Sequence, residues 1–152
     1  MLLKIGQWVT AWVIITSGVV WGAGNRLPIL VKSNSPGYVL PDFSFSEKCS
    51  LYADRVEIEY RMSESTVTEV RNLKGAKSLE VLVTRAASDK LRYEENLLCD
   101  GPTTEVFGFS RNASTKVVLY STGGCGTPKA IREGGAAYQL MRLVENYCAR
   151  TH

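Results

Sequence analysis

Histidine is almost absent from this sequence, and the single one, His152, is the last residue. A Ser-His-Asp or Cys-His catalytic arrangement needs an imidazole that a third group holds inside a site, and a chain terminus rarely provides one. The four cysteines contain no Cys-x-x-Cys pair and have no histidine among them. Their spacing therefore does not indicate zinc, and we expect no metal site.

Nucleotide-binding motifs and clustered charge are absent as well. The glycine-rich stretch Ser121–Pro128 (STGGCGTP) is not followed by Gly-Lys-Ser/Thr, and its GGCG run differs from the GxGxxG pattern of dinucleotide-binding folds. Basic and acidic residues are nearly balanced, 18 against 15, and the basic ones are scattered along the chain. This balance does not favour a nucleic-acid partner, and we expect no cofactor.

The amino-terminal segment has the features of a secretion signal. Lys4 supplies a positive charge, Trp8–Trp21 is mostly apolar, and Gly22-Ala23-Gly24 offers the small residues that a signal peptidase needs. The apolar run is shorter than the roughly 20 residues of a spanning helix. We predict a cleaved signal peptide over residues 1–24, with an uncleaved anchor as the alternative. Because Lys4 leaves with it, 17 basic and 15 acidic residues remain, a net charge of +2. The product is expected in the periplasm or outside the cell, without membrane contact.

Cysteines in an exported chain indicate disulfides, here two. Two strand-like runs, Thr104–Ser110 and Thr115–Ser121, flank a short polar tip. Folding them about that tip brings Cys99 level with Cys125, within the range that a disulfide bridges. The cysteines that remain, 49 and 148, then form the second bridge. Oxidised cysteines do not act as thiolate nucleophiles.

Two further strands and two helices are predicted on either side of this hairpin. Arg55–Met62 alternates apolar and charged residues as a half-buried antiparallel strand does, and Thr66–Asn72 is a second, weaker strand. The apolar residues of Ser78–Ser88 fit both the two-residue period of a strand and the spacing of a helix. Ser78 as an N-cap and the alanines at the end of the segment favour the helix. Thr127-Pro128 predicts the start of the last helix. Gly134-Gly135 leaves open whether that helix begins after the pair or whether the pair admits another backbone.

These elements predict an α+β fold. We expect an antiparallel sheet of about four strands in a ββα-ββα order, covered by two helices and braced by two disulfides. The domain would occupy residues 43–152, and residues 25–42, which are rich in proline, serine and glycine, would form an extended lead-in or linker.

The two ends of the hairpin are candidate binding surfaces. The glycine loop with Gly123, Gly124 and Gly126 could present backbone donors to an anion near a helix N-terminus, and Lys129 adds a positive charge. The alternative is a flexible turn that gives the neighbouring cysteine its bridging geometry. At the other end, Arg111 and Asn112 form an exposed tip, where Asn112-Ala113-Ser114 is a formal glycosylation acceptor. We prefer the glycine loop.

Glu57 and Glu59 share a strand face and could in principle perform acid–base chemistry as paired carboxylates do in glycosidases. Their interleaving with Arg55 and Arg61 favours an ordinary solvated face with cross-strand charge pairs. The leading hypothesis is an exported binding module, for instance an inhibitor of a secreted enzyme, with a secreted or envelope protein as its partner. The alternatives are a small carboxylate-based hydrolase and a structural component of the cell envelope. The sequence favours a protein without catalytic residues.

Overall fold

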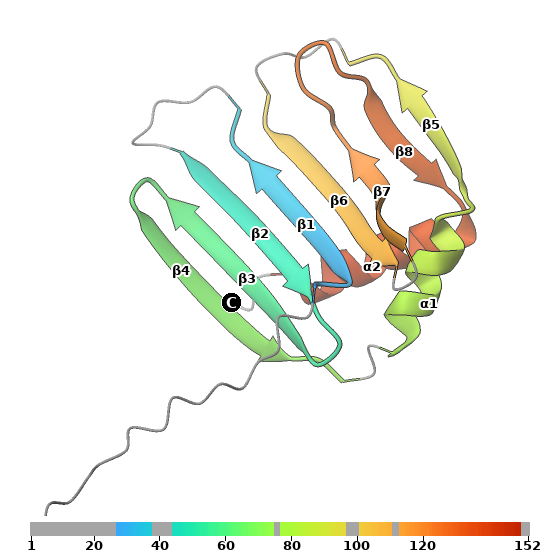
Figure 1. Cartoon of the computed structure of the whole chain (residues 1–152). Helices are drawn as coiled ribbons and strands as arrows, with labels where there is room; N and C mark the ends of the chain where they lie inside the picture. Colours follow the sequence, from blue (N-terminus) through green and yellow to red (C-terminus); the bar gives the residue numbers. More distant parts are fainter. Residues whose placement is uncertain (1–26, 38–43, 75–76, 97–100, 111–112, 150–152) are drawn as a thin grey trace, which may run out of the picture.

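The computed structural model describes residues 27–37, 44–74, 77–96, 101–110 and 113–149. They form one antiparallel sheet of eight strands with two helices against one of its faces (Figure 1). The elements in chain order are β1 (Leu30–Ser35), β2 (Phe45–Leu51), β3 (Arg55–Met62), β4 (Ser65–Asn72), α1 (Lys77–Ala86), β5 (Lys90–Glu94), β6 (Thr103–Ser110), β7 (Ala113–Ser121), β8 (Lys129–Glu133) and α2 (Gly135–Tyr147). Across the sheet the strand order is β4-β3-β2-β1-β6-β7-β8-β5.

This architecture corrects the predicted fold class. The chain is α+β with two helices, but the sheet of about four strands in a ββα-ββα order is wrong, because eight strands are present in a ββββα-ββββα order. Two disulfides were predicted. Only one of them lies entirely within the described residues. Among the missed strands, β5 and β8 have only five residues each, and β1 and β2 show no clear alternation of apolar and polar residues, so the local patterns are weak.

The disulfide that is described joins Cys49 to Cys148, as predicted, with a Cα–Cα distance of 5.9 Å. It fixes the end of α2 to β2, and both cysteines are buried. The other predicted bridge includes Cys99, which lies outside the described residues. No described cysteine is a free thiol.

Several predicted elements are confirmed. β3 covers the predicted range, with Val56 and Ile58 buried beneath the helices. β4 follows it after a tight turn. The predicted helix within Ser78–Ser88 is present as α1, which begins at Lys77, so Ser78 lies inside the helix and is not its N-cap. The hairpin of β6 and β7 is present, with Phe107 opposite Val118 and a register shift beside that pair.

β1 is a strand that the sequence analysis placed in the lead-in. It lies at the centre of the sheet between β2 and β6 (Figure 1). Leu30 faces the helices and Val31 the opposite face, and both are at most 2% exposed. A strand that is buried on both faces shows a continuous apolar run instead of alternation. Pro28 and Pro36 lie just outside the strand and do not interrupt it.

The predicted helix start at Thr127-Pro128 is also wrong. Lys129–Glu133 is the strand β8, and α2 begins at Gly135. The backbone of Gly134 is extended, which any residue can adopt, but a Cβ there would come within 2.0 Å of the Asp89 carboxyl carbon. Gly134 therefore allows the close approach of the Asp89 side chain, whereas the sequence analysis considered the approach of another backbone segment. Asp89 Oδ2 accepts a hydrogen bond of 3.2 Å from the N–H of Ala137, in the first turn of α2.

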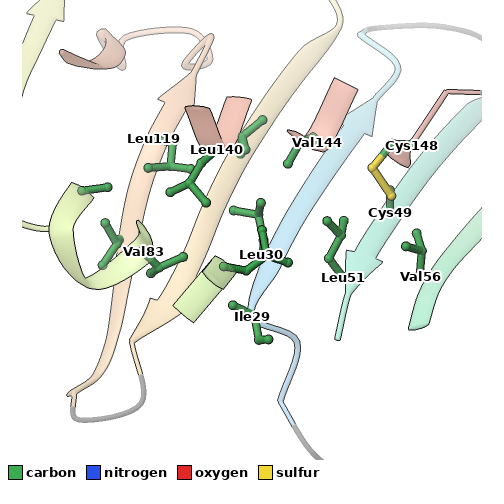
Figure 2. Close-up of a cluster of buried hydrophobic side chains, with 14 of the residues drawn as sticks. Ile29, Leu30, Cys49, Leu51, Val56, Val83, Leu119, Leu140, Val144 and Cys148 are labelled. Atoms are coloured by element: carbon green, nitrogen blue, oxygen red, sulfur yellow. A yellow bond between two sulfur atoms is a disulfide. The ribbon is translucent and has the colours of Figure 1, made fainter. Parts of the chain in front are cut away.

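The core lies between the sheet and the two helices. Figure 2 shows Leu140 and Val144 of α2 pointing toward Leu30 on β1, with Val83 of α1 packing beside them. α1 approaches β6 closely, because a Cβ on Gly108 would meet the Val83 side chain at 2.8 Å. Together these contacts hold both helices against a single face and leave the other face without helices.

Two arginines satisfy the carbonyl groups at the helix C-termini, which have no partner within the helix. Arg132 on β8 donates to the carbonyls of Ala86, Ala87 and Asp89 at 2.8–3.3 Å, and thereby caps α1. Arg71 on β4 donates to the carbonyl of Tyr147, the last residue of α2, at 3.3 Å and to that of Ala149 at 2.8 Å. A cation at a helix C-terminus also favours the helix dipole. Within the part of the chain described, neither helix is long and apolar enough to cross a membrane.

Candidate functional site

The sheet face opposite the helices carries a groove with a volume of about 510 Å³. Its floor is a row of four directly paired residues on four neighbouring strands: Glu105 faces Ser121, Ser121 faces Ala130, and Ala130 faces Tyr93. Directly paired residues project to the same face of a sheet. The row therefore crosses β6, β7, β8 and β5 at the right-hand side of the sheet in Figure 1.

The walls of the groove come from an edge strand and from the loop between β7 and β8. Leu91 and Tyr93 of β5 line one side, and Val118 of β7 also lines the groove. Gly123, Gly124, Thr127 and Pro128 of the loop line the other. The lining is therefore mostly apolar, with the polar side chains of Glu105 and Ser121 on the floor and threonine hydroxyls at the margin.

Hydrogen bonds fix the loop to the neighbouring strand. The Thr122 N–H donates to the Thr104 carbonyl, and the Thr104 N–H donates to the Thr122 hydroxyl, both at 2.9 Å. The Asn96 side chain donates to the Thr122 carbonyl at 2.8 Å. Gly123 has a φ of +67°, and a Cβ at this position would lie 2.4 Å from the Thr127 carbonyl oxygen. Only glycine fits this turn, which gives the wall its fixed shape.

The predicted anion site finds little support in this geometry. The N–H of Gly123 donates to the Ser121 hydroxyl at 3.1 Å, and the N–H of Gly124 donates to the Thr127 hydroxyl at 2.6 Å. The expected helix N-terminus is not adjacent, because the next element is a strand. Lys129 pairs with Glu94 at 3.2 Å. Gly123 and Gly124 therefore contribute shape to the groove, and their N–H groups are already bonded within the loop.

Of the sequence-predicted binding residues, the structure brings two into the groove. Gly123 and Gly124 line it, whereas Gly126 and Lys129 are not among the residues around it. Arg111 and Asn112 lie outside the described residues, so the tip of the hairpin stays a prediction.

The charge at the margin of the groove is neutralised within the protein. The Glu105 carboxylate accepts a hydrogen bond from Lys116 Nζ, and this ammonium lies 4.1 Å from the centre of the Phe107 ring. Phe107 packs edge-to-face against Phe109 with 5.5 Å between the ring centres. Beside the groove, the ion pair of Lys116 and Glu105 therefore covers the two phenylalanine rings. The cation–π contact between Lys116 and Phe107 stabilises this arrangement.

Glu57 and Glu59, the candidate acid–base pair, lie elsewhere on the sheet. Arg55 Nε donates to Glu57 Oε1 at 2.6 Å, and the Arg55 guanidinium lies 4.2 Å above the Tyr52 ring. Burial raises the pKa of the Tyr52 phenol, and the neighbouring Glu57 carboxylate raises it further. The hydrogen bond to Glu57 also raises the pKa of Arg55. Glu57 is thus paired with an arginine of its own strand, whereas the sequence interpretation expected charge pairs across strands.

Sequence reasoning missed the groove because its floor depends on β8. Leu91 and Tyr93 form part of β5, which pairs only with β8, about 40 residues away in the sequence. The sequence analysis assigned the residues of β8 to the last helix. The glycine pair after Glu133 was the available signal, since glycine is unfavourable inside a helix by about 1 kcal/mol. Within the described residues, no group of three or more metal-ligating side chains is present.

No protein-family model, curated protein or solved structure matches the chain.

Proposed function

We propose that the protein is an exported binding module, in which the groove over β6, β7, β8 and β5 receives a short apolar segment of a partner protein. The observation that carries this proposal is a groove on the face that the helices leave open, with the row from Glu105 to Tyr93 as its floor and mostly apolar residues around it. The partner is a secreted or envelope protein, because it must meet this module outside the cytoplasm.

The exposure of Tyr93 favours a protein partner over a small molecule. This side chain lines the groove yet is 63% exposed. A small-molecule site usually encloses 70–90% of its ligand, which requires deeper walls. Tyrosine is enriched at the centres of protein–protein interfaces, where its ring adds contact area and its hydroxyl a hydrogen bond. A shallow groove with an exposed tyrosine suits a peptide segment laid across it.

The rigidity of the site supports a role in recognition. The floor is hydrogen-bonded sheet, and the glycine-loop wall is tied to β6 through Thr104 and Thr122. A preformed surface loses little conformational freedom on binding. Inhibition of a secreted enzyme is one form of binding that a preformed surface of this kind could serve.

Export is supported by two features of the chain. The amino-terminal segment has the pattern of a signal peptide. The described part contains a buried disulfide that joins residues 99 positions apart, and such bridges persist in oxidising compartments.

The test is a peptide selection against the purified protein. A phage library of random peptides of about 12 residues should yield binders rich in apolar side chains. Tyr93→Glu should weaken their binding by about tenfold or more, since it places a charge in the apolar groove. Tyr138→Glu is the matched control, because Tyr138 lies on α2 and is 66% exposed.

Two outcomes would contradict the proposal. One is a selection that enriches no peptide. The other is a set of peptides whose affinity Tyr93→Glu leaves unchanged, since such peptides bind elsewhere on the molecule.

A further inference from the structure

The two edges of the sheet differ in how well they are protected against pairing with another strand. β5 is five residues long, and three of them are charged: Lys90, Arg92 and Glu94. Short length and charge are common protections of sheet edges. β4, at the opposite edge, has eight residues and pairs with β3 in an uninterrupted register. It contains neither lysine nor proline, and two of its valines are 58% and 62% exposed.

The hydrogen-bond pattern shows which residues of β4 point their backbone outward. The Leu73 N–H donates to the Asp54 carbonyl at 2.8 Å, which makes 54 and 73 a hydrogen-bonded pair. Such pairs alternate along an antiparallel ladder. In the continuous register of β3 and β4, residues 65, 67, 69 and 71 therefore bond to β3. Thr66, Thr68, Val70 and Asn72 direct their N–H and carbonyl groups away from the sheet, and no described strand pairs with them.

We propose that this edge pairs with the β4 edge of a second copy of the chain, antiparallel and with the two-fold axis at Val70. Two eight-stranded sheets would then join into one continuous sheet. In this register Val70 faces Val70 of the partner, Thr68 faces the partner's Asn72, and Asn72 faces the partner's Thr68. These three hydrogen-bonded pairs, each exchanging two bonds, give six new backbone hydrogen bonds.

Charge complementarity selects this register over its neighbours. Residues on the opposite face pair as well, and an axis at Val70 places Glu69 opposite the partner's Arg71 in both halves of the dimer. An axis at Glu69 would place the two Glu69 carboxylates opposite each other, which is unfavourable. An axis at Thr68 would bring Glu69 opposite the partner's Val67. Within one chain Arg71 Nε already bonds Glu69 Oε1 at 2.6 Å, so the dimer would hold an alternating cluster of four charges.

A single pair of strands buries less than the roughly 1,200 Å² of a standard interface, so we expect dissociation constants in the micromolar range. Sedimentation equilibrium of the purified protein up to about 200 µM should show a reversible dimer with twice the monomer mass. Val70→Lys places two lysines opposite each other at the axis and should raise the dissociation constant at least about tenfold. Val81→Lys is the matched control, because Val81 is a similarly exposed valine on α1, away from the β4 edge, and it should leave the dimer in place.

Cysteine cross-linking distinguishes the registers. Under a mild oxidant Val70→Cys should form a covalent dimer, because directly opposite Cα atoms lie about 5.5 Å apart. Thr68→Cys and Glu69→Cys should not, since their symmetric distances exceed about 7 Å. Circular dichroism of each variant confirms that it is folded. A monomer at all concentrations would overturn the proposal, and so would cross-linking at residue 68 or 69 in preference to 70.

Discussion

Gly134 and Asp89 should be energetically coupled, because the Asp89 carboxylate occupies the space next to the glycine and caps α2 from outside the helix. A Cβ at position 134 would lie 2.0–2.4 Å from three atoms of that carboxyl group. Gly134→Ala must therefore displace Asp89 and break its 3.2 Å hydrogen bond to the Ala137 N–H. Since the glycine backbone is extended, the effect arises from this contact and not from backbone strain.

The size of each effect follows from the contact that is lost. Asp89→Ala removes a helix cap, which typically destabilises a protein by about 1 kcal/mol. Gly134→Ala loses the same cap and adds the strain of an overpacked site, for a total of about 2–3 kcal/mol. In the double variant the carboxylate that would clash is absent. Its loss should be about 1–2 kcal/mol, and therefore smaller than the sum of the single losses by at least about 1 kcal/mol.

Urea unfolding of the four proteins, followed by circular dichroism, gives the coupling directly. We expect the double variant to be at least as stable as Gly134→Ala alone. Losses that add within about 0.5 kcal/mol would refute the reasoning, because residues that do not contact each other behave in that way.

Three further predictions concern the links that hold the helices to the sheet. Replacing Cys49 and Cys148 together by alanine should lower the free energy of unfolding by up to about 4.7 kcal/mol, the chain-entropy value for a loop of about 100 residues; an unchanged urea midpoint would contradict this. The hydrogen bond from Arg71 lowers the pKa of Glu69, so the associated stability is present above the unfolded-state pKa and is lost as the pH falls through the folded-state value. Glu69→Gln should therefore destabilise the protein at neutral pH and not in strong acid, which urea unfolding across that pH range checks; an equal loss at every pH would contradict it. Arg132→Met leaves the carbonyls at the end of α1 without their charged donor and should cost about 2 kcal/mol, seen as faster hydrogen exchange in α1, and unchanged exchange would contradict it.

Local patterns were sufficient where a strand or helix buries a single face. β3 alternates apolar and charged residues because one side packs under the helices and the other meets solvent. The helix α1 was predicted over its strand alternative from the alanines at its end, and in the structure Leu79, Val83 and Ala86 are all buried at helical spacing. The pairing of Cys49 with Cys148 was predicted because the hairpin assigns Cys99 to Cys125 and leaves these two cysteines for each other, and the structure confirms it.

Local patterns failed where burial or pairing depends on distant residues. β1 begins with two buried apolar residues on opposite faces, Leu30 and Val31, and its other four residues are polar, so it shows no amphipathic period. β8 has five residues, and its strand conformation is stabilised by pairing with β5 and β7. The Thr127 hydroxyl, predicted as a helix cap, instead accepts from the Gly124 N–H in the loop. The same side-chain chemistry serves a turn as well as a helix, and only the tertiary structure distinguishes the two.

The groove was only partly accessible to prediction for the same reason. Gly123 and Gly124 were singled out by composition, and both line the groove. The role expected of them was different, since their N–H groups are bonded within the loop. The residues that give the groove its apolar character, above all Tyr93, come together through strand pairings that no local motif indicates.

The central claim is that the groove over β6, β7, β8 and β5 is the binding surface, and chemical-shift mapping tests it most directly. The ¹⁵N-labelled protein would be titrated with the tightest peptide from the selection. The account predicts that the largest shifts fall on β5, on β8 and on the loop between β7 and β8, centred on the amides of Tyr93 and Gly124. Shifts confined to α2 or to the β4 edge, with Tyr93 and Gly124 unchanged at saturation, would contradict it.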